Sequence, residues 1–332
     1  MTTRARVFSG VQPTGGLHLG NYLGALKQWV RHQGERENVF CIVDLHALTV
    51  PEARKPEQLR HDGRALAAMF VACGIDPQQS VVFVQSHVRE HAELAWILNC
   101  VTPIGWLERM TQFKSKAEGR ETVGTGLMTY PVLQAADILL YDTNIVPVGE
   151  DQRQHIELAR DIATRFNNLF GETLVIPAAT LPVAGARVMG FDEPTVKMSK
   201  SIAVSRPAHA VMIDEDPARI KKTIMRAVTD GGCDYDVATA SPGVVNLMGV
   251  LSAITGEKVA DISARYAGKG YGYLKAEVAD AVITEMAPVR EKYQRLMGDP
   301  AELDRVVAVG ANQARAMAIP VMERVRAAVG TG

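Results

Sequence analysis

The sequence has little of what marks several large classes of protein. Of its 332 residues only 4 are cysteine, and aromatic residues make up 6%. Cys41, Cys73, Cys100 and Cys233 stand far apart and lack the paired spacing of metal-binding motifs. We therefore expect these cysteines to fill the core of a reduced, cytoplasmic protein.

Long apolar runs and an excess of one charge are also missing. No window approaches the roughly eighteen apolar residues of a membrane span, and no apolar signal-peptide segment opens the chain. The net charge is −1, so the total does not indicate a nucleic-acid partner, although a local basic face can sit within a neutral total. Hydrophobic residues make up 47% of the chain, which is ordinary for a globular protein of about two domains.

The first two-thirds of the chain alternates strand-like and helix-like stretches. The strand-like stretches are short, apolar and rich in β-branched residues: Arg6–Gly10, Val39–Leu45, Ser80–Ser86 and Asn144–Gly149. Helical patterns cover Leu19–Gln33, Pro56–Cys73, His91–Cys100, Gly126–Tyr141 and Asp151–Phe170. This alternation predicts an α/β fold, a doubly wound parallel sheet with helices on both faces.

The chain changes character from about Arg206. Helix-start signals and two long helical patterns follow, over 269–297 and 299–329, each interrupted by one proline. No strand signal is present there. We expect a first domain over residues 1–190, a linker loop over 191–205, and an all-helical domain over 206–332 whose last helix could return to the first domain.

A glycine-rich turn, "FSGVQPTGGLHLGNYLGAL" (Phe8–Leu26), follows the first expected strand. Ligands of open α/β sheets bind beyond the carboxyl ends of the strands, and the free N–H groups of a helix N-terminus suit phosphate. The spacing matches neither G-x-G-x-x-G nor the P-loop. Taken alone, the turn is equally well explained as a tight connection.

A second stretch, "KMSKS" (Lys197–Ser201, the KMSKS segment), lies between the two expected domains. Two ammonium groups three residues apart, with hydroxyls beside them, can hold a polyphosphate whose charge moves during a reaction. Isolated lysines usually form a solvated loop, but together with the glycine-rich turn the pair favours a phosphate site.

Several stretches together resemble one family. The turn Pro13–Asn21 and the KMSKS segment look like the HIGH and KMSKS signatures of class I aminoacyl-tRNA synthetases. Three more stretches resemble the bacterial tryptophanyl-tRNA synthetases of that class: "CIVDLHALTV", "ERMTQFKSK" and "YPVLQAADILLYDTNIVPVGEDQRQHIELARD". The resemblance continues through "KKTIMRAVTD" and "YAGKGYGYLKAEVAD", and so covers essentially the whole chain.

The resemblance implies a fold and a reaction. The fold is a Rossmann-like catalytic domain with a C-terminal all-helical domain that contacts the tRNA anticodon. The reaction joins ATP and L-tryptophan into tryptophanyl-adenylate, releases pyrophosphate, and transfers tryptophan to tRNA(Trp). The attacking carboxylate is already ionised at neutral pH, so orientation and electrostatics can serve without a general base. Also implied are a homodimer and Mg²⁺ as the counterion of ATP, without a structural metal.

The resemblance carries roles to particular residues that handle ATP. His18, Lys197 and Lys200 are the catalytic residues, the two lysines holding the departing pyrophosphate. Val188 and Met198 flank the adenine. The remaining ATP contacts that it implies are Gln12, Pro13, Thr14, Gly20, Asn21, Lys114, Gly149, Glu150, Asp151, Ser199 and Ser201.

Tryptophan is implied to bind to five residues. Tyr130 and Gln152 would hold its ammonium group, Asp137 its indole N–H, and Phe8 and His46 would complete the pocket. Asp137 lies within the apolar "AADILLY", where a carboxylate needs a partner. Tyr130 precedes Asp137 by two helical turns, which places both on one face. A structural ion pair of Asp137 with an arginine is the alternative.

Some residues keep two interpretations. Gln134 stands where many bacterial relatives have methionine, and it either varies without consequence or reshapes the indole pocket. His46 suits a pocket or a loop equally, and His155 is expected at a helix surface or interface. The tryptophans, Trp29, Trp96 and Trp106, are expected to serve in packing.

The RNA partner rests on the resemblance alone, because residues from Arg206 onward carry sixteen Lys and Arg against sixteen Asp and Glu. A basic stripe on one helix, Arg219, Lys221, Lys222 and Arg226, is only suggestive. Three alternatives stay open. A tyrosyl-tRNA synthetase would more often carry "SDQ" in place of "GEDQ", a regulatory paralogue would have lost part of the ATP-handling set, and another nucleotidyltransferase would lack "KMSKS".

Overall fold

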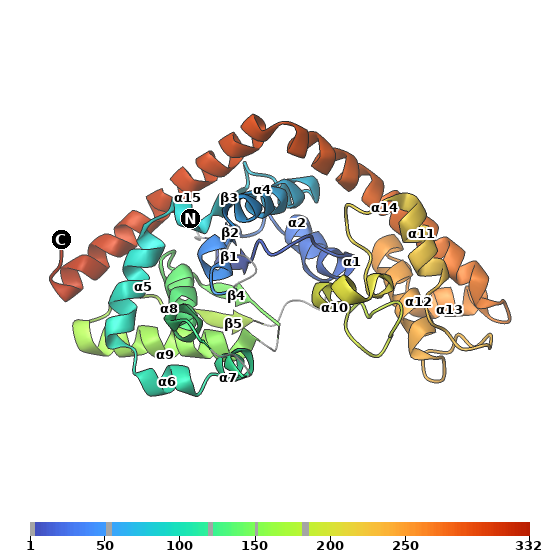
Figure 1. Cartoon of the computed structure of the whole chain (residues 1–332), viewed down its shortest axis with the longest axis horizontal. Helices are drawn as coiled ribbons and strands as arrows, with labels where there is room; N and C mark the ends of the chain where they lie inside the picture. Colours follow the sequence, from blue (N-terminus) through green and yellow to red (C-terminus); the bar gives the residue numbers. More distant parts are fainter. Residues whose placement is uncertain (1–3, 51–54, 119–121, 150–151, 181–185) are drawn as a thin grey trace.

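A parallel sheet lies at the centre of the N-terminal half (Figure 1). The computed structural model describes residues 4–50, 55–118, 122–149, 152–180 and 186–332. The strand order is β3-β2-β1-β4-β5, with β1 (Arg6–Val11), β2 (Glu37–Ile42), β3 (Ser80–Val84), β4 (Ile145–Pro147) and β5 (Ala178–Thr180). The first four strands confirm the prediction, whereas the patterns do not predict β5, a three-residue strand that follows Pro177.

Both faces of the sheet are covered. Along β2, Val39 and Cys41 join the apolar cluster that contains α5, α8 and α9, while Phe40 and Ile42 join the cluster that contains α4. Side chains of a strand alternate between faces, so two apolar layers form. The helices are α4 (Pro56–Ala72), α5 (Glu90–Val101), α8 (Thr125–Leu139) and α9 (Arg153–Phe170), with the shorter α3 (Asp44–Ala47), α6 (Ile104–Glu108), α7 (Thr111–Ala117) and the 3₁₀ turn η3 (Gln85–His87). The predicted Rossmann-like doubly wound sheet is confirmed.

The helix after β1 begins at the predicted residue but is not uniform. It consists of α1 (Leu19–Asn21), a π-helical segment η1 (Tyr22–Leu26) and α2 (Lys27–Arg31). His18 caps its start, because its Nδ1 accepts from Asn21 N while Asn21 Oδ1 accepts from His18 N. This reciprocal cap satisfies two backbone donors and orients both side chains of the turn.

The C-terminal part is helical, as predicted. It contains α10 (Lys200–Ser205), η5 (Pro207–His209), α11 (Pro217–Met225), α12 (Pro242–Thr255), α13 (Val259–Tyr266), α14 (Tyr271–Gly298) and α15 (Pro300–Val329). Pro288 and Pro320 lie inside α14 and α15, which run on without the expected interruption. Figure 1 shows α14 and α15 meeting in an inverted V. Among the described residues, none of the helices combines the length and apolarity of a membrane span.

Helix α15 leaves the helical part and lies along the edge strand β3. The contact is so close that a Cβ on Gly310 would stand 1.8 Å from Val82 O. Arg326 and Glu93 of α5 form a bidentate ion pair of 2.6 and 2.7 Å. α15 therefore covers a sheet edge that would otherwise offer unpaired backbone groups.

Candidate active site

A pocket of about 360 Å³ opens at the carboxyl ends of β1 and β4. The strand order reverses between these two strands, and this reversal is where ligands of open α/β sheets bind. Five residues of the predicted tryptophan site line it together with Gln12 and Gln134: Phe8, His46, Tyr130, Asp137 and Gln152. We call it the sheet-edge pocket. Its walls combine apolar side chains with polar groups that can orient a ligand.

Asp137 is the most buried polar group of the pocket, with 1% exposure. Its Oδ2 accepts from His46 Nε2 at 2.7 Å, and its Oδ1 accepts from Gln85 Nε2 and His91 Nδ1, both at 2.6 Å. No arginine takes part in these contacts. Burial alone would raise the pKa of Asp137, but its electrostatic interactions and hydrogen bonds with His46 and His91 hold it well below its usual range. The side chain is therefore a carboxylate.

The chain of contacts continues behind Asp137 to Tyr141. The Tyr141 hydroxyl lies 2.6 Å from His91 Nε2, and burial raises the pKa of Tyr141, so the phenol keeps its proton and can donate it to that nitrogen. His91 Nδ1–H then donates to Asp137. A carboxylate offers about four acceptor positions, two on each oxygen. Two donors occupy Oδ1 and one occupies Oδ2, so one lone pair of Oδ2 remains available to a ligand.

Tyr130 lies across the pocket and has its own partners. Its hydroxyl donates to Gln112 Oε1 at 3.2 Å and lies 2.9 Å from His155 Nε2. Burial raises the pKa of Tyr130 to about 12, so the phenol is neutral. Of the two positions expected for His155, a helix surface or an interface, the surface is wrong, because His155 is 1% exposed. His155 stands on the buried stripe of α9 with Leu158, Ala159 and Ile162.

The turn before α1 holds His18 as a neutral ring. Burial, together with the charges of Lys197 and Lys200, lowers the pKa of His18 to about 4. Since Nδ1 accepts from Asn21 N, the single proton is on Nε2, which is left as a donor. A Cβ on Gly20 would stand 3.0 Å from His18 Nδ1, so a side chain at that position would crowd the imidazole.

The KMSKS segment reaches this turn although about 180 residues separate them in the sequence. Lys200 Nζ lies 3.5 Å from Thr14 Oγ1. Gly15 has φ +87°, and a Cβ there would lie 3.1 Å from Lys200 Nζ, so only glycine suits the turn. Burial lowers the pKa of Lys200. Lys197 is exposed, and the hydroxyls of Ser199 and Ser201 are 2.8 Å apart.

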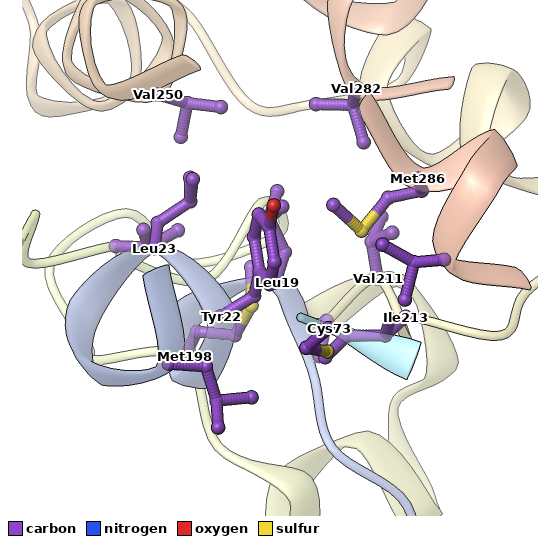
Figure 2. Packing of buried hydrophobic residues seen from close by; sticks show 14 of the residues in the cluster. Leu19, Tyr22, Leu23, Cys73, Met198, Val211, Ile213, Val250, Val282 and Met286 are labelled. Carbon is purple, nitrogen blue, oxygen red and sulfur yellow. The ribbon is translucent and has the colours of Figure 1, made fainter. Parts of the chain in front are cut away.

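The adenine-flanking pair of the prediction lies in an apolar cluster. Val188 and Met198 are each 2% exposed. Figure 2 shows Met198 packed near Leu19, Tyr22 and Leu23 of the helix after β1. The KMSKS segment is thereby attached to the turn by apolar packing as well as by Lys200.

The other predicted ATP residues are more scattered. Pro13 is buried behind the turn, Gly149 is exposed just after β4, and Lys114 is exposed on α7, outside the lining of the sheet-edge pocket. Glu150 and Asp151 lie outside the described residues. The structure thus brings the two signature motifs together, while Lys114 stays apart from the pocket.

The sequence patterns do not single out Gln85, His91, Tyr141 or Gln112. Gln85 directly follows β3, and carboxyl ends of parallel strands share one edge of the sheet, so its position could have indicated it. His91 carries no local signal, because the packing of α5 on α8 brings it to Asp137 and to Tyr141.

Comparison with models of protein families matches residues 1–287 to "tRNA synthetases class I (W and Y)". The chain therefore belongs to this family of class I tRNA synthetases. Among curated relatives, the tryptophan–tRNA ligase of Caldanaerobacter subterraneus subsp. tengcongensis is 48% identical over 326 residues, covering 98% of each chain. That of Bacillus anthracis is also 48% identical over 326 residues, covering 98% of this chain and 97% of the relative.

Solved structures agree with this placement. The tryptophanyl-tRNA synthetase of Campylobacter jejuni, complexed with ADP and tryptophan, is 38% identical with a TM-score of 0.86, covering 98% of this chain and 99% of the other. The tyrosyl-tRNA synthetase of Aeropyrum pernix is 18% identical with a TM-score of 0.67, covering 92% and 89%, and so shares the fold alone. The resemblance to bacterial tryptophanyl-tRNA synthetases is confirmed.

Proposed function

We propose that this protein is a tryptophan–tRNA ligase of the cytoplasm, where proteins are made. It activates L-tryptophan with ATP to tryptophanyl-adenylate and pyrophosphate, then transfers tryptophan to tRNA(Trp). The observation that carries the proposal is 48% identity to such ligases over 98% of the chain. The sheet-edge pocket beside the joined signature motifs supports it.

In the activation step, a carboxylate oxygen of tryptophan attacks the α-phosphorus of ATP. The new O–P bond forms as the bond to the β-phosphate oxygen breaks, and pyrophosphate leaves with the electron pair. No proton moves. Lys197 and Lys200 hold the leaving phosphates, and the neutral His18 donates Nε2–H rather than adding charge. Mg²⁺ enters as the counterion of the phosphates.

ATP lies along the glycine-rich turn. Its path is lined by five residues of the turn and the helix that follows: Gln12, Pro13, Thr14, Gly20 and Asn21. Three further residues contact the phosphates: Ser199, Ser201 and Lys114. Val188 and Met198 flank the adenine, and Gly149 with Glu150 and Asp151 meets the ribose. The joined position of Thr14 and Lys200 supports this path.

Tryptophan occupies the sheet-edge pocket. The free lone pair of Asp137 Oδ2 accepts the indole N–H, Tyr130 and Gln152 hold the ammonium group, and Phe8 and His46 form the walls. The burial of Asp137 supports selectivity, because a ligand without the N–H leaves a buried acceptor unpaired.

The chain is divided into a catalytic domain (1–190), the KMSKS linker loop (191–205) and a helical domain (206–332) that contacts the tRNA anticodon. The basic stripe of α11 supports tRNA contact only in part. Arg219 pairs with Glu215 at 2.5 Å and Lys221 approaches Asp280 at 3.7 Å. Lys222 and Arg226 are exposed and can contact the phosphate backbone of the tRNA.

The protein acts as a homodimer. Leu48, Trp96 and Val123 are 46%, 71% and 40% exposed and line one groove of about 940 Å³ beside α5 and α8. Exposed apolar surface of this kind marks an interface. The exposure of Trp96 also shows that the expectation of a role in internal packing is wrong for this residue. Trp96→Glu should yield monomers in light scattering, whereas Trp106→Phe should stay dimeric. A monomeric wild-type protein would contradict the proposal.

Tryptophan-dependent exchange between ATP and pyrophosphate tests the function directly. Exchange is expected with tryptophan and not with tyrosine. Exchange with tyrosine would indicate a tyrosyl-tRNA synthetase, and exchange with neither would indicate a regulatory paralogue. Charging of tRNA(Trp) by the same preparation tests the second step.

A further inference from the structure

We propose that His209 is a positioning residue for the reaction: it holds the backbone of Lys197, and with it the KMSKS segment, against the His18 turn. The proposal rests on the proposed function of that segment in holding pyrophosphate. It concerns a residue that lies outside both signature motifs, in η5.

The contacts of His209 join two points of the linker between the domains. The side chain is fully buried. Its Nδ1 lies 2.6 Å from Asp192 Oδ1, and its Nε2 lies 3.2 Å from the carbonyl oxygen of Lys197. The ring thus connects the residue where the loop begins to the first lysine of the KMSKS segment.

Both ring nitrogens face oxygen acceptors, so the ring makes both hydrogen bonds only when it carries two protons. Asp192 supplies the opposite charge and also accepts from Arg206 Nε at 2.8 Å. Burial alone would raise the pKa of Asp192, but the hydrogen bonds of Arg206 and His209 hold it below its usual range. An ionised Asp192 can therefore accept a hydrogen bond from His209 Nδ1. Glu193, which pairs with Arg206 at 2.8 Å, adds negative charge to the same cluster.

The ring fits its position without spare room. A Cβ on Gly190 would lie 2.2 Å from His209 Cε1, so the imidazole rests directly on the loop backbone. Gly190 N donates to Val196 O at 2.8 Å, and Met198 N donates to Val188 O at 3.0 Å. These bonds make a small hairpin, and His209 supports the strand of the hairpin that carries Lys197.

The other strand of the hairpin has an independent anchor. Asn246 of α12 accepts from Met189 N at 2.9 Å and donates to Met189 O at 3.1 Å. The hairpin should therefore persist when His209 is replaced, while the Lys197 strand loosens. Misplacement of a catalytic group by about 1 Å can cost on the order of 100-fold in rate.

The test compares His209→Phe and His209→Gln with a control, His32→Gln, whose ring contacts Glu35 instead. In tryptophan-dependent exchange, we expect His209→Phe to lower kcat roughly 10- to 100-fold with an unchanged KM for tryptophan. His209→Gln should recover part of kcat, because its amide can still donate to Lys197 O. An unchanged kcat in His209→Phe would overturn the positioning role of His209 and leave the proposed function intact. An inactive wild-type protein would overturn the proposed function.

A second measurement does not depend on activity. Hydrogen exchange of the Met198 and Gly190 amides should accelerate in His209→Phe and not in His32→Gln. Wild-type exchange rates at both amides in His209→Phe would overturn the proposal.

Discussion

The sheet-edge pocket and the junction of the His18 turn with the KMSKS segment treat polar groups in opposite ways. In the pocket, Asp137 has three protein donors, and two of them come from histidines that are themselves buried. At the junction, Lys197 and Lys200 gather around His18, and burial with this positive charge lowers the pKa of His18. The carboxylate of the pocket has its hydrogen-bond partners before a ligand arrives. The positive charge of the junction is neutralised only when an anion binds.

This difference matches two tasks. Selection of an amino acid needs an acceptor held in one place, and a satisfied buried network gives that rigidity. Transfer of a nucleotide needs positive charge aimed at phosphates whose charge grows in the transition state. Grouped cations cost stability in the free protein, and bound ATP would relieve their repulsion.

The largest effect is expected at Asp137. Asp137→Ala leaves His46, Gln85 and His91 without their acceptor and removes the proposed indole acceptor. The preference for tryptophan over phenylalanine in exchange kinetics should narrow by as much as about 10⁴-fold. The free energy of unfolding should fall by about 3–5 kcal/mol, measured by urea denaturation.

Asp137→Asn is the matched control, because its amide oxygen can still accept while only the charge is lost. Its effect on selectivity should be milder. Normal tryptophan affinity and selectivity in Asp137→Ala would place the indole acceptor elsewhere and leave Asp137 with a structural role.

At the junction, Lys200→Ala should act on rate rather than on binding. Loss of one donor to the departing pyrophosphate costs about 10²–10³ in rate, or about 3–4 kcal/mol. Tryptophan binding, measured by calorimetry, should be unchanged. Lys221→Ala on α11 is the control, and a near-normal activation rate in Lys200→Ala would remove this residue from the catalytic set.

The smallest effect concerns the pH dependence of stability. The pKa of His18 is 6.5 in its ordinary state and about 4 in the folded protein. Between these values His18 binds more protons in the unfolded chain than in the folded protein. The free energy of unfolding therefore rises with pH from about 4 to 6.5, and the contribution of His18 to stability is lost as the pH falls through this range.

The contribution amounts to at most about 3.4 kcal/mol. His18→Gln should flatten the slope of stability against pH in that window, as measured by urea denaturation. An equally steep slope in His18→Gln would mean that the charged junction does not disfavour a protonated His18.

The errors of the sequence interpretation have physical causes. The long periodic helices and the apolar strands β1 to β4 follow from local patterns, while β5 is too short to carry one. His155 lies at the helical spacing of the apolar stripe on α9, so the period of that stripe indicates a buried position for His155. Cys100 and Cys233 are exposed rather than buried, because they lie away from the packed faces of their segments.

The sequence by itself determined the strand–turn–helix order, the reciprocal cap of the turn and the family, because these depend on residues a few positions apart. His18 and Asn21 cap one another across three residues. The tertiary structure decided which distant groups meet. Asp137 accepts from side chains 46, 52 and 91 residues away, and Lys200 reaches Thr14 across 186 residues. Such contacts depend on how whole helices pack on the sheet, and no local pattern of residues specifies that packing.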